Sequence, residues 1–370
     1  MNTMPRPTSG SAHKRRTLAS IAEELGISRT TVSNAYNRPD QLSPALRNKI
    51  LATAERMGYT GPDPAARSLR TRRAGAIGVL LTEELTYAFE DQASLEFVSG
   101  VSIACSEMDS SMLLVPAGVH PDAPQEHATQ LINQASVDGF IVYSVAADDP
   151  FLQAVIHRGI PTVICDQPAS MDNTHFVGIN DREAIKPAAQ AVIDAGHTNI
   201  GVLSIRLDRE PNNGVVSAER LSHAAMDVQR SRVEGVIDVL DDAGLDSSNI
   251  PIVERFINNA DTAYEAAQEL LETHPELTAI VCTTDSMALG ALRYAHDAGI
   301  SVPTELSITG FDGIPAAVEN GLVTVRQPSR DKGHLSGQCL ARIIAGEQQP
   351  LHQLLPTELL AGTSVAAPQS

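Results

Sequence analysis

From residue 75 onward, short apolar runs alternate with stretches of helical periodicity, and this alternation constrains the fold more than any other feature. Helical patterns lie at residues 151–158, 184–195, 228–243, 262–272 and 286–298. Strands are predicted at residues 76–81, 112–116, 139–143, 161–165, 176–179, 199–203, 279–283 and 306–311. Because these runs are apolar throughout, they predict parallel sheets covered by helices on both faces. The segment is too long for one core, so we expect two α/β lobes with a cleft between them.

Polar residues that directly follow the strands are the first candidates for a ligand site, because ligands of parallel sheets bind beyond the carboxyl ends of the strands. Asp166, Asp285 and Asp312 each follow a predicted strand, and Arg232 lies at the start of a predicted helix. Carboxylates and a guanidinium facing a cleft suit an uncharged, polyhydroxylated ligand. Each residue also has an ordinary structural explanation, since an Asp after a strand often caps a helix and an Arg is often solvated.

Aromatic side chains are further candidates, because a ring can stack on a sugar or a base. They are Tyr87, Phe89, Tyr143 and Phe256. Each such residue is more often part of the core than of a site. A pentose, a hexose, a cyclic polyol and a nucleoside all fit two Asp and one Arg, so the sequence leaves the ligand open.

Residues 18–37 predict two short helices joined by a tight turn. Gly26 ends the first helix and Ser28 can cap the second, while Ile27 and Val32 can pack as a hydrophobic staple that fixes the entry angle. The first helix has one apolar stripe, formed by Leu18, Ile21, Ala22 and Leu25. Short helix pairs are common in any helical domain, so this pattern alone leaves DNA binding and a plain helical domain equally open.

The second of these helices presents a polar face with groups suited to base edges and phosphates. That face carries Arg29, Thr30, Ser33 and Asn34. Charge supports this interpretation, because residues 1–74 carry a net charge of +8 whereas residues 75–370 carry −26. A basic unit on an acidic body is typical of a phosphate-binding headpiece, although a run of charge can also be only a solvated face.

Composition excludes several classes of protein. No apolar run is long enough to span a membrane, and the polar N-terminus lacks a signal peptide, so we expect a cytoplasmic protein. Four scattered cysteines show no metal-ligand spacing and are expected to be free, buried thiols. The motifs GxGxxG, GxxxxGK[ST], GxSxG and HExxH are absent, so we expect no enzyme, no cofactor and no metal.

The N-terminal part divides into three predicted pieces. Residues 1–13 are expected to be a disordered tail, and residues 14–60 a three-helix unit. Ser43 and Pro44 start the third helix, which buries Leu46, Ile50 and Met57. Residues 61–74 contain a stiff Pro-rich break and then a short, marginal helix, or else an ordinary interdomain linker.

In this order, these pieces resemble the LacI/GalR family of bacterial transcription repressors over nearly the whole chain. The most specific strings are TLASIAEELGISRTTVSNAYN (17–37), LSPALRNKILATAERMGY (42–59) and AARSLRTRRAGAIGVLL (65–81). Weaker ones are CDQ (165–167), AGHTNIGVL (195–203), TTDSMALGAL (283–292) and SITGFDGIPAA (307–317). The resemblance implies a three-helix helix-turn-helix headpiece, a hinge helix at residues 61–74, and a two-lobed core at residues 75–370 shaped like periplasmic binding proteins.

By position, the resemblance also implies roles for single residues. Leu69 matches the leucine that the family inserts into the minor groove, a wedge that kinks the duplex. Asp166, Arg232 and Asp312 match positions that line the family's effector cleft. Base-reading positions fall at Arg29, Thr30 and Asn34. Phosphate-contacting or supporting positions fall at Thr17, Ser28, Ser33, Asn37 and Ser43.

Several departures bear on this transfer. Thr284 stands where the family usually has Asn, which weakens a ligand role for the neighbouring Asp285. One extra residue near Gly61 precedes the hinge. The segment 205–230 is long and polar, and is either a lid or disordered. The C-terminus lacks a leucine heptad, which favours a homodimer over a tetramer.

The predicted function is therefore a transcription repressor whose affinity for a pseudo-palindromic operator is controlled by a small ligand. We expect the ligand to release the operator. The first alternative is a sugar-binding receptor without a DNA role, and the second is a sugar-metabolising enzyme.

Overall fold

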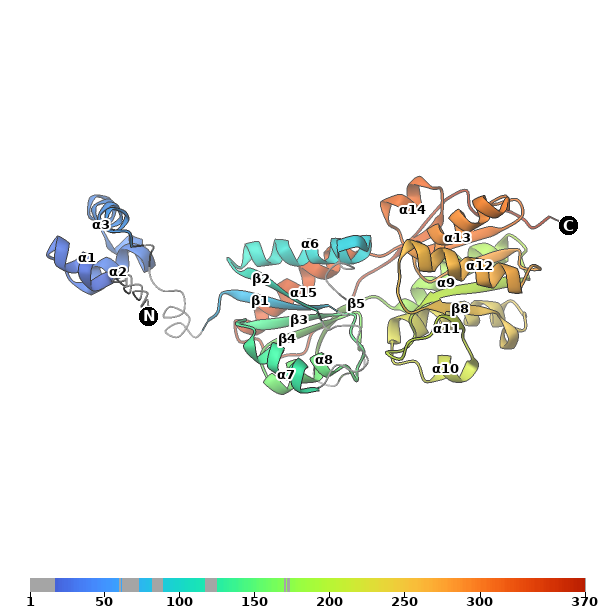
Figure 1. Ribbon diagram of the computed structural model, residues 1–370, viewed down its shortest axis with the longest axis horizontal. Helices are drawn as coiled ribbons and strands as arrows, with labels where there is room; N and C mark the ends of the chain where they lie inside the picture. Colours follow the sequence, from blue (N-terminus) through green and yellow to red (C-terminus); the bar gives the residue numbers. More distant parts are fainter. Residues whose placement is uncertain are drawn as a thin grey trace, which may run out of the picture. The chain divides into compact units, whose positions relative to one another are not determined.

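The computed structural model describes residues 17–59, 61, 73–81, 89–116, 125–169, 171 and 174–369. The chain forms two compact units, Met1–Ala74 and Gly75–Ser370 (Figure 1). The expected tail at residues 1–13, the hinge residue Leu69 and the aromatic candidate Tyr87 lie outside the described residues. Within the described part of the chain, no helix has the length and apolar character needed to cross a bilayer.

The described part of the first unit is helical. Its elements are α1 (Leu18–Leu25), α2 (Arg29–Asn37), the 3₁₀ helix η1 (Pro39–Gln41) and α3 (Pro44–Arg56). The Ser28 Oγ caps α2 by accepting a hydrogen bond from the Thr31 N–H at 3.0 Å. Gly26 ends α1 in the left-handed region, at φ 63°, which a residue without a Cβ adopts readily. The predicted turn between α1 and α2 is confirmed.

Apolar side chains from all three α-helices meet in one small core. The buried members are Ile21, Ala22, Val32, Ala35, Ile50 and Ala54. Ile27, Leu46 and Met57 pack against this cluster. Ile27 and Val32 thus share one apolar environment, as the predicted staple requires.

The first lobe of the second unit is a parallel sheet with the strand order β12-β5-β4-β3-β1-β2. Its strands are β1 (Ala76–Leu81), β2 (Ser111–Pro116), β3 (Gly139–Tyr143), β4 (Thr162–Cys165), β5 (His175–Gly178) and β12 (His352–Leu354). Helices α6 (Gln92–Glu107) and α15 (Ser329–Ile344) cover one face, and α7 (Gln125–Gln134) and α8 (Pro150–Arg158) cover the other (Figure 1).

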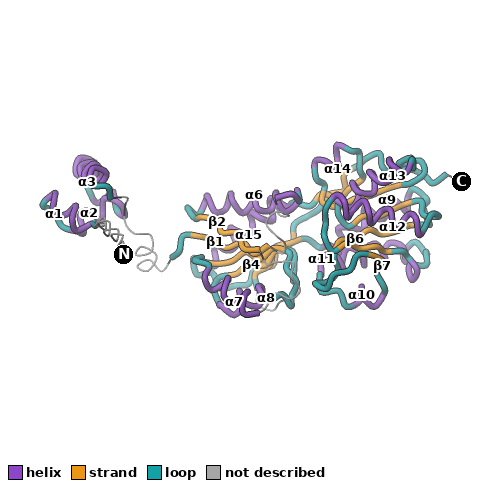
Figure 2. The backbone as a smooth tube through the Cα atoms, viewed as in Figure 1, coloured by secondary structure: helices purple, strands orange, loops and turns teal. Residues whose placement is uncertain are grey.

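The second lobe is a sheet with the order β13-β11-β10-β9-β6-β8-β7, parallel except at its two edge strands. Its strands are β6 (Ile200–Ile205), β7 (Gly214–Val215), β8 (Ile252–Arg255), β9 (Ala279–Cys282), β10 (Ser307–Asp312), β11 (Val323–Arg326) and β13 (Glu358–Leu360). Its helices are α9 (Asp181–Asp194), α10 (Ala218–Ser222), α11 (Asp227–Asp242), η2 (Ser247–Asn249), α12 (Ala260–Thr273), α13 (Asp285–Ala298) and α14 (Pro315–Glu319). Helices α9 and α11 pack on one face, and α12 and α13 on the other. Figure 2 distinguishes the strands of both lobes, in orange, from their helices, in purple.

The chain passes between the lobes three times within its described residues. The passages lie between β5 and α9, between β11 and α15, and between β12 and β13. The second passage leads directly into α15, which crosses α6 at close range. A Cβ at Gly333 would overlap the carbonyl oxygen of Phe97, and a Cβ at Gly100 would overlap that of Arg330. Glycine is therefore required where the two helices touch.

Every predicted strand is present, with bounds that differ by two residues or fewer. The segment 205–230, which the sequence left open between a lid and disorder, is ordered and contains β7 and α10. The fully buried Glu254 anchors it, because this carboxylate accepts hydrogen bonds from the Leu207 N–H at 2.8 Å and the Asn212 Nδ2 at 2.6 Å, and also pairs with Arg220. Of the two alternatives left open, disorder does not hold, because one buried acid binds the polar residues of the segment.

Candidate functional site

Helix α2 presents a polar surface to solvent in the first unit. Arg29 and Thr30 are exposed at its start, and Asn34 is half-buried and donates from Nδ2 to the Gln41 Oε1 at 3.2 Å. Asn37 Nδ2 donates to the Ser33 carbonyl oxygen at 3.0 Å, which fixes the end of the helix. The surface thus combines two exposed polar side chains with two amide side chains that hydrogen bonds hold in place.

Three predicted phosphate-contacting residues are helix caps. Thr17, Ser28 and Ser43 are the N-caps of α1, α2 and α3. Each hydroxyl is exposed and close to backbone N–H groups at the start of a helix, where anions are favoured. The caps explain why Ser or Thr stands at these positions for stability alone, and their phosphate contacts stay a prediction.

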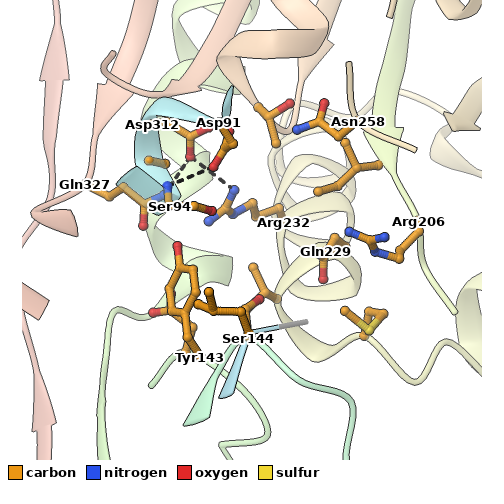
Figure 3. Close-up of a pocket in the computed structure, with 17 residues that line it drawn as sticks. Asp91, Ser94, Tyr143, Ser144, Arg206, Gln229, Arg232, Asn258, Asp312 and Gln327 are labelled. Carbon is orange, nitrogen blue, oxygen red and sulfur yellow. Dashed lines mark hydrogen bonds and ion pairs between the residues drawn. The ribbon is translucent and has the colours of Figure 1, made fainter. Parts of the chain in front are cut away.

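A cavity lies between the two lobes of the second unit, at the carboxyl ends of strands from both sheets (Figure 3). It has a volume of about 680 Å³, which includes space open to solvent. The first lobe contributes Leu81, Asp91, Ala93, Ser94, Tyr143, Ser144 and Asp166. The second lobe contributes Ile205, Arg206, Met226, Val228, Gln229, Arg232, Asn258, Thr284, Asp312 and Gln327. The structure therefore brings the predicted residues Asp166, Arg232 and Asp312 to one cavity.

The Arg232 guanidinium is held on three sides. Its Nε donates to the Asp181 Oδ1 at 2.8 Å, and its Nη1 donates to the Thr283 carbonyl oxygen at 2.9 Å. Its carbon Cζ lies 3.8 Å from the centre of the Phe311 ring, a cation–π contact. The charge of Asp181 helps to raise the pKa of Arg232 against the opposing effect of burial, so the guanidinium stays charged.

A second chain of polar contacts connects the carboxylates of the two lobes. The Lys332 Nζ lies 2.8 Å and 2.7 Å from the two oxygens of Asp166, and 2.6 Å from the Gln327 Oε1. The Gln327 Nε2 in turn donates to the Asp312 Oδ1 at 2.6 Å. Burial raises the pKa of Asp312 well above its usual value, with Arg232 opposing the shift.

Backbone strain concentrates at the same cavity. Ser144, Asp166 and Asp312 have φ angles of 55°, 68° and 120°. Among the described residues, one other non-glycine residue, Asp109, has a positive φ. Such conformations are unfavourable for residues with a Cβ and persist where the surrounding structure imposes them, which is typical of binding sites.

The aromatic candidates have different positions. Tyr143 lines the cavity and stacks on Phe97 with ring centres 3.9 Å apart, and burial raises the pKa of its hydroxyl well above the usual value. Phe89 is exposed and is not among the cavity residues. Phe256 is buried under the Arg206 guanidinium, 5.6 Å from ring centre to Cζ, and does not line the cavity. The predicted role of Phe256 in stacking on a ligand is therefore corrected: its ring packs against Arg206, which lines the cavity.

Asp285 also departs from the prediction, because it faces the protein interior and not the cavity. Its Oδ1 accepts from the Thr324 Oγ1 at 2.6 Å, and its Oδ2 accepts from the Ile314 N–H at 2.8 Å. Burial raises its pKa to about 6. The structural role that the sequence left open for Asp285 is the one found, and Thr284 lines the cavity in its place.

Several cavity residues were missed by the sequence reasoning. Gln327 directly follows β11 and Asn258 lies shortly after β8, and neither strand was predicted. The rule that polar residues after strands line the site would have found both, had the strands been recognised. Arg206 directly follows β6, a strand that was predicted, so the same rule applies to it and it was overlooked. Gln229 in α11, and Lys332 in α15 behind the cavity residue Asp166, carry no comparable signal, because long polar side chains in helices are usually solvated.

Comparison with known proteins agrees with this geometry. Residues 74–361 match the family described as periplasmic binding proteins and sugar binding domain of LacI family. The HTH-type transcriptional regulator IpsA of Corynebacterium glutamicum is 54% identical over 350 residues, covering 95% of this chain and 97% of IpsA. An HTH-type transcriptional regulator of Mycobacterium tuberculosis is 45% identical and covers 96% of this chain and 98% of its own length.

Solved structures show the same architecture. A LacI-family transcriptional regulator from Corynebacterium glutamicum superimposes with a TM-score of 0.76 at 49% identity, covering 96% of this chain and all of that one. The complex of the transcriptional regulator CelR with cellobiose gives a TM-score of 0.68 at 25% identity, covering 95% of this chain and all of that one.

A helix-turn-helix unit followed by a two-lobed core with a cleft between parallel sheets defines a ligand-responsive class of DNA-binding proteins. The chain belongs to the LacI family. Like its close relatives it is a DNA-binding transcription regulator and not an enzyme.

Proposed function

We propose that this regulator binds a small, uncharged, polyhydroxylated ligand in the cavity between its lobes, and that the ligand controls its affinity for a DNA operator. The observation that carries the proposal is the composition of the cavity wall, in which Asp166 and Asp312 approach from opposite lobes. Carboxylates accept hydrogen bonds from hydroxyl groups, and a ligand that contacts both closes the cleft. The binding of cellobiose by the related CelR supports a carbohydrate or a cyclic polyol.

The charge of the cavity favours an uncharged ligand over an anionic one. The carboxylates of Asp166 and Asp312 already have cationic neighbours, Lys332 and Arg232, in the ion pairs between them. An anionic group at either carboxylate meets like charge, and the neighbouring Lys332 and Arg232 are already paired, which is unfavourable in a buried site. A sugar or polyol hydroxyl has no such cost.

On the DNA side, we propose that α2 reads the major groove through Arg29, Thr30 and Asn34. The exposed donors at the start of this helix support that role, because the first residues of a recognition helix contact base edges. Two copies of the chain would bind a pseudo-palindromic operator as a homodimer in the cytoplasm, with Leu69 entering the minor groove. Ligand binding would then release the operator, with a coupling of about 1–3 kcal/mol as is typical of allosteric proteins.

A thermal-shift screen of the full chain against pentoses, hexoses, cyclic polyols and nucleosides tests the ligand class. A ligand that binds only the folded state stabilises it by RT ln(1 + [L]/Kd), so Tm rises with the logarithm of ligand concentration once the site is saturated. We expect a response to one uncharged polyol or sugar, and we expect Asp312→Asn to remove it. A response confined to phosphorylated or carboxylated compounds would contradict the proposal.

Selection of bound sequences from random duplex DNA tests the operator. We expect one pseudo-palindromic site, and we expect the compound from the thermal-shift screen to weaken binding in a gel shift. Deletion of residues 1–74 should abolish DNA binding and leave the thermal shift intact. A deletion variant that still selects the same site would exclude the headpiece as the reader.

A further inference from the structure

Lys332 is a buried cation that is not among the site residues predicted from the sequence. Its side chain is fully buried within α15, on the helix face that packs against the sheet of the first lobe. Its ammonium group contacts both oxygens of Asp166 and the Gln327 Oε1, so its three donors have three acceptors. Lysine is almost never fully buried without a partner, because removal of the charge from water is costly.

Asp166 is the one of these acceptors that the ligand would touch. It lines the cavity at the end of β4, and its side chain is 9% exposed. Its backbone is in the left-handed region, at φ 68°, and Lys332 holds both carboxylate oxygens at once. Gln327 extends the contact from Lys332 to Asp312 across the passage between the lobes.

We propose that Lys332 is a positioning residue of the ligand site, which pairs with the Asp166 carboxylate, fixes its orientation at the cavity and joins it through Gln327 to Asp312. This inference rests on the proposed function for its meaning, since the carboxylates are the groups that accept the ligand's hydroxyls. Two acceptors held at fixed places in opposite lobes discriminate between hydroxyl arrangements, as a preorganised site does.

Other ionisable groups surround this contact and enter its electrostatics. Burial lowers the pKa of Lys332, and the charge of Asp166 and the other acidic neighbours more than offsets it, so the ammonium stays protonated. Besides Asp166, the groups near Lys332 or along the same cavity are Cys165, Asp181, Asp312, Asp91, Tyr143 and Arg232. All of them are retained in the variants below. Burial raises the pKa of Asp181 and of Cys165, and the charge of Lys332 opposes both shifts, so the double variant is needed to isolate the part of the effect that depends on Asp166.

The test is thermal unfolding of the full chain at pH 5 and pH 8 for the native protein, Lys332→Met, Lys332→Arg and the double variant Lys332→Met with Asp166→Asn. Without Lys332, Asp166 must stay charged without a counter-ion or take up a proton, and proton uptake becomes harder as pH rises. We therefore expect Lys332→Met to lower Tm by roughly 5–10 °C at pH 8 and by clearly less at pH 5.

The double variant separates this role from simple space filling. Replacement of Asp166 removes the carboxylate that Lys332 contacts, so we expect most of the pH-dependent part of the loss to disappear, while Lys332→Arg keeps most of the native pH profile. A Lys332→Met loss that is equal at both pH values, or that persists unchanged in the double variant, would overturn the proposal. No ligand enters this experiment, so its failure is distinct from a failure of the ligand screen.

Discussion

Arg232 and Asp312 form an ion pair on the side of the cavity that belongs to the second lobe, with 3.6 Å between the Arg232 Nη1 and the Asp312 Oδ1 (Figure 3). The same guanidinium pairs with Asp181, so a single cation balances two buried carboxylates. Burial raises the pKa of both acids, and the charge of Arg232 opposes both shifts.

Arg232→Ala should therefore destabilise the fold as well as abolish the ligand response. Two buried carboxylates lose their counter-ion, and breaking a buried pair costs about 3–5 kcal/mol. Urea denaturation of the full chain measures this. The matched control is Arg182→Ala on the neighbouring α9, where an exposed guanidinium pairs with Asp238 and Glu234 and is worth about 1 kcal/mol or less. Equal losses in the two variants would contradict the assigned burial.

Asp285→Asn should be tolerated and should flatten the dependence of stability on pH. A carboxyl whose pKa rises from 3.8 to about 6 on folding stabilises the protein fully at low pH, and that contribution is lost as pH rises to about 6. Relative to the variant, the native protein should lose about 2 kcal/mol between pH 4 and pH 7. Denaturant midpoints at both pH values measure this, and because Asp285 lies outside the cavity the ligand response should persist. A constant difference would show that Asp285 does not titrate there.

Gly333→Ala should disrupt the crossing of α6 and α15. The added methyl group meets the carbonyl oxygen of Phe97, which is backbone and has no room to move, and overpacking of this kind costs about 1–3 kcal/mol or more. Gln338→Ala, at an exposed position of the same helix, serves as the control and should change Tm little. A native Tm in the glycine variant would show that the helices separate more easily than their contact implies.

Arg29→Ala should weaken binding to the selected operator about 5- to 150-fold and relax its sequence preference, because a base contact contributes about 1–3 kcal/mol. Lys49→Ala removes the same charge from an exposed position of α3 and should affect operator and random DNA alike. Fluorescence anisotropy with both duplexes measures the ratio of affinities. If Arg29→Ala leaves that ratio unchanged, Arg29 does not read a base.

The sequence predicted the framework of the fold because its strands are apolar on both faces. Runs such as residues 139–143 carry that signal without help from the rest of the chain. The missed strand β8 contains Glu254 and Arg255, two buried charged residues whose partners come from distant segments. A pattern of apolar residues cannot predict such a strand, and Asn258 was lost with it.

The candidate site was predicted in part for the same reason. Asp166 and Asp312 follow apolar strands and were found, whereas Lys332 lies inside a helix whose sequence is polar. Its burial depends on the packing of α15 against the sheet of the first lobe, where Asp166 follows β4. That information is held in contacts between segments that are distant in the chain, and local sequence does not contain it.

The three passages of the chain between the lobes also limit how the core can move. Two domains joined by a single flexible linker can rotate about many axes. Three short connecting segments resist shear between the lobes and leave one dominant rotation. A ligand that closes the cleft would then rotate one lobe relative to the other in a defined direction. The three passages together act as one hinge, so cleavage of the backbone in any one of them should weaken the proposed response to the ligand before it unfolds the protein.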